Sequence, residues 1–179
     1  MGGSNGRIEI PLAEDELRQV TLFAAACARR VLTLFEAAYL DDPRPREAIG
    51  EAEAFGEGGR RTAALRTKSW AAYAAAREAE DAPAANAAYA ASHAAGAAYL
   101  HPIASPHQVK HILGAAVHQA LALELQAGDD PGVGREQLLW AASLASPEVR
   151  SVLRRIPPLP RGRGRFSEML GALDAALRG

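Results

Sequence analysis

All five histidines of the chain lie between His93 and His118, and three of them fall in one predicted helix that begins near Pro106. At about 100° per residue, His107, His111 and His118 project from this helix within roughly 40° of each other. An imidazole is a common ligand of zinc, and two imidazoles spaced i and i+4 can share one ion. The sequence lacks the Glu-x-x-His and His-Glu-x-x-His motifs that mark many helical metal sites. The pattern therefore favours histidines that are partly exposed or hydrogen-bonded between helices.

The alternative is that this histidine stripe binds a metal ion or a small molecule. The predicted metal ligands are then His107, His111 and His101, although the sequence as a whole predicts no bound metal and no cofactor. Gly114 lies in the same stripe, where the missing side chain would let a helix or a ligand approach the backbone closely.

Apolar residues lie on both sides of the same helix. Val109, Ile112 and Ala116 form one face, while Leu121 and Leu125 continue the histidine stripe on the other. A helix of this kind is usually central in a bundle or covered by a partner. The pattern favours a central helix. A ligand groove, or a homodimer contact through the two leucines, is the alternative.

Two arginines flank a proline directly after a pair of aspartates. Arg44 and Arg46 stand at the start of a predicted helix, where each guanidinium could form a bidentate contact with a carboxylate or phosphate of a partner. The favoured interpretation is that they pair with Asp41 and Asp42 and fix the turn. The candidate partner- or ligand-binding residues are therefore Arg44, Arg46, His101, His107, His111, Gly114 and His118.

Signals for catalysis are weak. The sequence contains no phosphate-binding glycine-rich loop, and its pattern supports no cysteine–histidine pair. Cys27 is the only cysteine and falls in an apolar helical pattern, so we expect a small buried side chain rather than a reactive thiol. We predict no catalytic residues and no enzyme activity.

The spacing of apolar residues predicts the helices that position these side chains. Steps of three and four from Leu17 to Ala38 predict a long helix over residues 14–40. Prolines and glycines divide the rest of the chain, which gives further predicted helices over residues 46–55, 60–80, 83–100, 106–127, 135–145, 147–155 and 166–177. In the helix over 60–80, Tyr73 falls on the same side as Leu65. Serine or aspartate directly before a proline predicts three N-caps, which are Ser105, Asp130 and Ser146.

No segment alternates apolar and polar residues with period two, as a strand would. The predicted fold class is all-α, a compact bundle of about seven to eight helices. We expect one domain over residues 1–179, with a flexible N-terminus at 1–11 and a proline-, arginine- and glycine-rich linker at 157–165.

Charge and hydropathy exclude several classes of partner. The formal net charge of -1 predicts no nucleic acid and no anionic membrane surface as partner. The basic run from Arg154 to Arg165 has few aromatic residues and indicates a solvated linker. Charged residues or histidines interrupt every long apolar segment, and no hydrophobic run follows the first residues. We expect a cytoplasmic protein.

Several stretches resemble a family of bacterial, mainly actinobacterial, immunity proteins of polymorphic toxin systems. The resemblance includes Asp-Pro-Arg-Pro-Arg-Glu-Ala-Ile at residues 42–49 and His-Gln-Val-Lys-His-Ile-Leu-Gly at residues 107–114. Further resembling stretches lie at residues 23–28, 31–36, 63–66, 93–95 and 98–102. The resemblance covers about the first two-thirds of the chain and weakens after Gly128.

This resemblance implies a protein that binds and neutralises a cognate toxin through a non-catalytic interface. It also implies that the proline–arginine turn and the histidine segment are the sites of contact. A metal- or small-molecule-binding helical bundle that uses the histidine stripe is the competing function, and a structural or dimerising module is a third.

Overall fold

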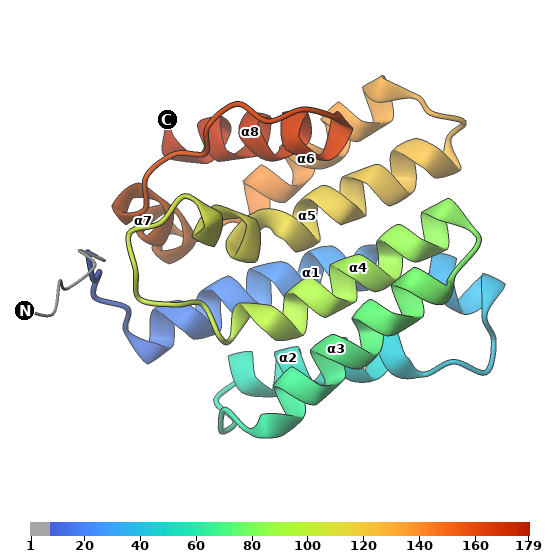
Figure 1. Cartoon of the computed structure of the whole chain (residues 1–179), viewed down its shortest axis with the longest axis horizontal. Coiled ribbons are helices and arrows are strands. Elements are labelled where there is room, and N and C mark those ends of the chain that lie inside the picture. The colour runs from blue at the N-terminus through green and yellow to red at the C-terminus, as the bar shows by residue number, and fades with distance from the viewer. Residues whose placement is uncertain (1–7) are drawn as a thin grey trace, which may run out of the picture.

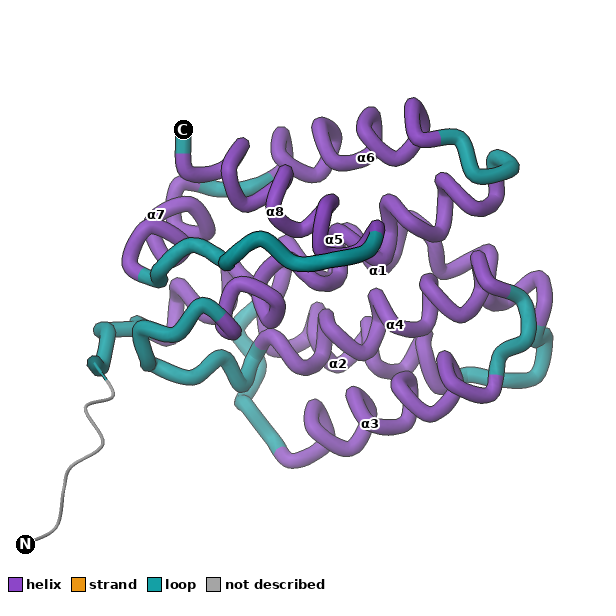
Figure 2. The backbone as a smooth tube through the Cα atoms, turned by 45° about the horizontal axis from the view of Figure 1, so that its top comes forward, coloured by secondary structure: helices purple, strands orange, loops and turns teal. Residues whose placement is uncertain are grey.

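The computed structural model describes residues 8–179, which fold into eight α-helices (Figure 1). They are α1 (Glu14–Ala38), α2 (Arg44–Gly56), α3 (Ala63–Glu78), α4 (Ala82–Ala97), α5 (His107–Gln126), α6 (Pro131–Leu144), α7 (Pro147–Arg155) and α8 (Arg165–Arg178). Within residues 8–179 there is no strand, and Figure 2 shows only helices and loops there. The prediction of an all-α bundle of seven to eight helices is confirmed.

Helices α1 and α4 lie at the centre of the bundle (Figure 1). Helix α4 packs against α1, α2, α3 and α5, and its buried residues are alanines except for Ser92. Alanine is the strongest helix former and has a small side chain, so α4 is a thin helix that four neighbours can approach closely. The alanine-rich segment therefore becomes the central contact of the fold.

Helix α5 also lies inside the bundle, in contact with α1, α4, α6 and α8. Its residues Val109 and Ile112 are fully buried, and Leu121 on the other side is partly buried against the core. The interpretation of this segment as a central helix is confirmed.

Two of the three predicted N-caps are confirmed. The side chain of Asp130 accepts a hydrogen bond from the backbone N–H of Gly132 at 2.8 Å, and that of Ser146 accepts one from Val149 at 3.4 Å. These bonds satisfy backbone donors that a helix start leaves unpaired. Helix α6 consequently begins at Pro131, four residues earlier than the apolar spacing indicates.

The prediction of Ser105 as an N-cap is wrong. Helix α5 begins at His107, and Pro106 before it has helical backbone angles. The N–H groups of Gln108 and Val109 donate to the carbonyls of Ser105 and Pro106, at 3.0 and 3.1 Å. Because this tight turn already satisfies those donors, no serine side chain is needed there.

The segment before α1 is held against the loop between α4 and α5, as Figure 2 shows for the described part. The N–H of Ile10 donates to the carbonyl of Pro102 at 3.0 Å, and the N–H of Ala104 donates to Ile8 at 2.7 Å. Ile10 is buried. The predicted flexible N-terminus therefore does not extend over residues 8–11, and its residues 1–7 lie outside the described part of the chain.

Helix α8 returns across α5 after the predicted linker, whose last residue, Arg165, already belongs to the helix. The Arg165 guanidinium donates to both carboxylate oxygens of Glu124 on α5, at 2.8 and 2.6 Å. This bidentate pair fixes the start of α8 to the last turn of α5, and the next residue, Phe166, packs against His118 of α5.

From α1 to α8, none of the helices has the length together with the apolar character that crossing a membrane requires.

Candidate binding cleft

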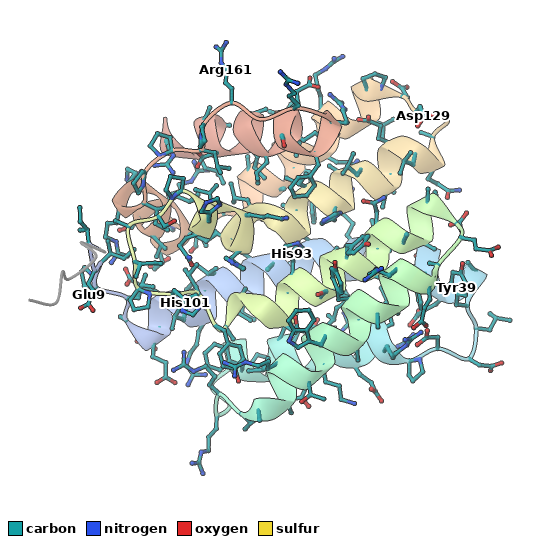
Figure 3. The ribbon with its side chains drawn as sticks, in the orientation of Figure 1. Glu9, Tyr39, His93, His101, Asp129 and Arg161 are labelled. Carbon is teal, nitrogen blue, oxygen red and sulfur yellow. The ribbon has the colours of Figure 1, made fainter. Side chains whose placement is uncertain are left out.

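A cleft of about 750 Å³ lies between α3 and α5, above α4. Both α3 and α5 pack on α4, which forms the floor of the cleft with Ser92, His93 and Gly96. His93 appears between α4 and α5 in Figure 3. The small residues of α4 set this floor low, so the two flanking helices rise above it as walls.

The wall from α3 consists of Arg66, Ser69, Trp70 and Tyr73. Trp70 is 65% exposed and Tyr73 is 39% exposed. The Ser69 hydroxyl donates to the carbonyl of Ser92 at 2.9 Å, which ties this wall to the floor. The sequence spacing groups Tyr73 with the buried Leu65, but its ring lies in the open cleft.

The opposite wall comes from the start of α5 and the loop before it. It consists of His101, His107, Lys110 and His111, and all four side chains are exposed. The backbone N–H of His101 donates to the side-chain oxygen of Gln108 at 3.1 Å, so the loop that carries His101 is fixed to α5. Figure 3 places His101 on this loop.

A second cavity of about 380 Å³ continues the cleft along α4. It shares Tyr73, His93 and Lys110 with the first cavity. The residues that it adds are Asn86, Tyr89, His118, Leu121 and Phe166. The two cavities together form one groove, to which α3, α4, α5 and α8 all contribute.

Aromatic rings connect the walls of the groove in a continuous series. Trp70 contacts Tyr73 edge-on, with ring centroids 5.8 Å apart, and Tyr73 contacts Tyr89 at 5.6 Å. Tyr89 stacks on His118 at 5.1 Å, and His118 packs against Phe166 at 4.8 Å. Such ring pairs contribute beyond their buried area and hold each other in place. The groove therefore presents a fixed aromatic surface.

Two histidines of the groove are held in their neutral form: His118 in this series and His93, whose ring stacks on that of His118 at 5.3 Å. Burial lowers the pKa of His93 to about 4, with a smaller effect from the nearby charge of Lys110. Burial also lowers the pKa of His118 well below its usual range, with additional effects from His93 and Lys110. His118 Nδ1 lies 2.8 Å from the side-chain oxygen of Asn86, so in the neutral ring Nδ1 donates.

The charge of the groove comes from Arg66 and Lys110. The Arg66 guanidinium lies over the ring of Tyr99, 4.4 Å from its centroid, and the Lys110 ammonium lies 5.4 Å from the centroid of Phe166. Neither cation forms an ion pair within residues 8–179. Among the described residues, no carboxylate lines either cavity. The groove is therefore aromatic and positively charged.

A family model described as "Imm-5 like putative immunity protein" matches residues 11–147. The chain belongs to this family. No match was found among curated proteins or among solved structures. The matched residues extend beyond Gly128, where the sequence resemblance weakens, and include α1 to α6. Helix α8 lies outside the matched residues, so Phe166 is an addition to the groove from beyond the family region.

The structure of this member of the immunity family separates the predicted histidine stripe into two parts. His107, His111 and His101 line the open cleft, whereas Gly114 is buried and His118 is partly buried. A Cβ atom at Gly114 would lie 2.6 Å from His93 Nδ1. The group that approaches Gly114 closely is thus a side chain of the same protein.

The histidines that were considered as metal ligands do not gather at one point. Within residues 8–179 there is no group of three or more His, Cys, Asp or Glu side chains that could hold a metal ion. Cys27 is buried in α1, and burial raises the pKa of its thiol to about 12. The thiol is therefore protonated and enclosed.

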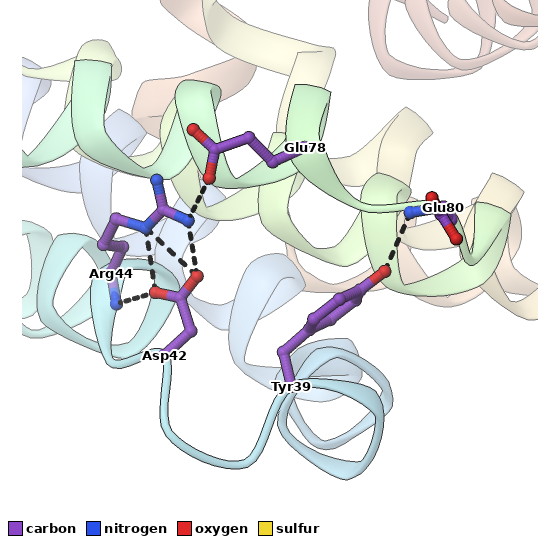
Figure 4. Close-up of polar contacts among 5 residues, drawn as sticks. All are labelled: Tyr39, Asp42, Arg44, Glu78 and Glu80. Carbon is purple, nitrogen blue, oxygen red and sulfur yellow. Dashed lines mark hydrogen bonds and ion pairs between the residues drawn. The ribbon is translucent and has the colours of Figure 1, made fainter.

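The arginines of the predicted turn lie away from the cleft and are paired with carboxylates of the same chain. Arg44 donates to both oxygens of Asp42 and to Glu78 at the end of α3, as Figure 4 shows. These hydrogen bonds hold the pKa of each carboxyl below its usual range. Arg46 pairs with Glu36 at 2.5 Å, whereas the sequence suggested Asp41 as a partner. Arg44 therefore joins the turn to α3.

Sequence reasoning missed most of the groove. The missed residues are Arg66, Ser69, Trp70, Tyr73, Asn86, Tyr89, Ser92, His93, Gly96, Tyr99, Lys110 and Phe166. One signal was present: within the alanine-rich segment, Asn86, Tyr89, His93 and Gly96 follow steps of three and four. This spacing places the larger side chains of that segment on one face, together with a glycine.

Proposed function

We propose that this protein neutralises a cognate toxin by binding it through the aromatic and basic groove, without catalysis. Family membership supports a toxin as the partner. The observation that carries the choice of surface is the exposed pair Trp70 and Tyr73 on the wall of the cleft, beside two cations that form no ion pair within residues 8–179.

Tryptophan, tyrosine and arginine are the residues that most often dominate the free energy of protein association. A tryptophan that is 65% exposed leaves apolar area in water, and a partner that covers it gains roughly 25 cal/mol per Å² of that area. The aromatic contacts hold Tyr73 and Trp70 in place before binding, which reduces the entropy lost on association.

The polar groups of the groove support a binding role. The Ser69 hydroxyl donates to a backbone carbonyl rather than to a histidine, and the two partly buried histidines interact with rings and with Asn86. A stoichiometric inhibitor needs no activated nucleophile. These side chains supply hydrogen-bond groups and a shaped surface instead.

The test is co-expression with the toxin domain encoded beside the gene for this chain. We expect the wild type to restore growth of the host and to co-purify with the toxin in a fixed ratio. Replacing the wall aromatics in a Trp70→Ala/Tyr73→Ala variant removes the exposed rings and should weaken binding at least about tenfold. Leu139→Ala is the matched control, because Leu139 is 69% exposed but lies on α6, outside the groove.

A wild-type chain that neither binds nor neutralises any neighbouring toxin would refute the proposed function. Equal weakening by the groove variant and by Leu139→Ala would leave the function standing but reject the groove as the surface. Circular dichroism of each variant verifies that the helices remain folded.

A further inference from the structure

From the charges of the groove, we infer that its occupant is an acidic segment of the toxin, whose carboxylates pair with Arg66 and Lys110. This inference rests on the proposed function and names the chemistry of the partner. Its first support is the charge of the groove itself. Among the described residues no carboxylate lines either cavity of the groove, and Arg66 and Lys110, which line it, form no ion pair within residues 8–179.

The two cations are held in place by aromatic faces, so their hydrogen-bond donors remain available. The Arg66 guanidinium lies over the Tyr99 ring at 4.4 Å. A guanidinium that stacks through its face keeps its N–H edge free for a bidentate contact with a carboxylate. Lys110 lies 5.4 Å from the centroid of the Phe166 ring and is exposed. Both cations are thus positioned before an anion arrives.

These cations lie on opposite walls of one cleft. Arg66 projects from α3, and Lys110 projects from the first turns of α5, while α4 forms the floor between them. The cleft volume of about 750 Å³ accommodates a few side chains but not a folded domain. A short segment with at least two carboxylates would contact both walls at once.

The small number of charges in the groove favours an acidic segment as occupant over a strongly polyanionic ligand. His93 and His118 are neutral, so they add polarity without charge. Nucleic-acid binding typically depends on many basic contacts, whereas this groove has two cations and the whole chain has a formal net charge of -1. Exposed Trp70 and Tyr73 suit apolar or aromatic side chains between the carboxylates of a peptide.

The experiment measures the affinity of the purified full chain for the cognate toxin carrying an inactivating substitution. The groove variants are Arg66→Gln, Lys110→Gln and the double variant. The control is Arg135→Gln, because Arg135 is exposed on α6 and forms no ion pair within the described residues. We expect each groove variant to lose about tenfold in affinity and the double variant to lose more. Raising the salt from about 50 to 500 mM should weaken the wild type strongly and the double variant little. The control should behave as the wild type.

A second arm uses two blocked peptides as probes, one of alternating Glu and Phe and one of alternating Lys and Phe. We expect the acidic peptide to shift the NMR signals of the Trp70 indole and of the Lys110 amide, and the basic peptide to leave them unchanged. This arm does not depend on any toxin, so it separates the two proposals. If the toxin fails to bind but the acidic peptide binds in the groove, the proposed function is wrong and the charge preference stands.

Toxin binding that is unchanged in the double variant, together with no preference for the acidic peptide, would overturn the inference while leaving the proposed function intact. Binding of a single-stranded oligonucleotide that Arg66→Gln abolishes would also overturn it. So would a dimer in light scattering that dissociates in the same variant, because the occupant would then be a second copy of the chain.

Discussion

Acidification should destabilise this protein through His93, because burial separates the proton affinities of the folded and unfolded states. The imidazole has a pKa of about 4 in the folded protein, compared with an ordinary value of 6.5. Lys110 and His111 oppose a positive charge on this ring, and His118 stacks against it at 5.3 Å. The unfolded chain therefore binds a proton first as the pH falls.

The sign and size of the effect follow from this difference in pKa. Since the folded-state pKa lies below the unfolded one, stability is complete above the ordinary value of 6.5 and is lost as the pH falls toward about 4. The full difference is worth about 3 kcal/mol, and lowering the pH from about 7 to about 5 removes roughly 2 kcal/mol of it. This loss is a large part of the ~5–15 kcal/mol that stabilises a typical domain.

The assay is urea unfolding at the two pH values for the wild type and for His93→Phe. The phenylalanine variant keeps a ring in the stack but cannot bind a proton, so its loss of stability on acidification should be about 2 kcal/mol smaller. Tyr89→Phe is the control, because it alters a neighbouring ring without altering titration in this range. Equal losses in the wild type and in His93→Phe would show that the ring is accessible to protons in the folded state, and the reasoning would be wrong.

Two other predictions concern packing and the buried ion pair. Gly114→Ala should lower the free energy of unfolding by about 1–3 kcal/mol, because the new Cβ would lie 2.6 Å from the His93 ring. Its control is Gly50→Ala in α2, whose Cβ meets nothing within 4 Å and which should raise the free energy of unfolding by about 0.5–1 kcal/mol. Thermal melts would measure both variants, and similar values would contradict the close contact at Gly114. Arg165→Met should lower the free energy of unfolding by about 2–3 kcal/mol, because the Glu124 carboxylate, which is 8% exposed, loses its partner. Adding Glu124→Gln to this variant removes the unpaired charge and should recover most of the lost stability. A double variant no more stable than Arg165→Met would contradict this explanation.

The helices could be predicted from the sequence because the signals that define them are local. Apolar residues at steps of three and four, with proline near helix starts, indicated all eight helices within a few residues of their bounds. The errors also have local causes. Ser105 has the residue type of a cap, but the tight turn at Pro106 satisfies the donors without its side chain. The side chain of Asp130 caps α6, which therefore begins before its first apolar residues.

The groove could not be predicted in the same way, because its walls come from separate helices and no local pattern specifies which helices become neighbours. Three histidines on α5 were recognised, but spacing within one helix could not show that His118 turns toward Tyr89 while His107 remains in the open cleft. Tyr73 shares a side of α3 with Leu65, and only the position of α4 decides which of the two is buried. Charge pairing is equally non-local, as Arg44 and Glu78 show.

The structure also separates the residues that stabilise the groove from those available for recognition. His93 and His118 have lowered pKa values because they are enclosed among other rings, so their substitution should alter stability before it alters binding. Arg66 and Lys110 are exposed and form no ion pair within the described residues, so removing their charge should alter binding without altering the fold. Stability therefore depends on the enclosed histidines, whereas the charge of the groove depends on Arg66 and Lys110. Under the function proposed above, the two charged residues can change to suit a different toxin while the alanine-rich core remains the same. Exchanging wall residues between members of this family should therefore transfer partner preference without a matching change in the melting temperature.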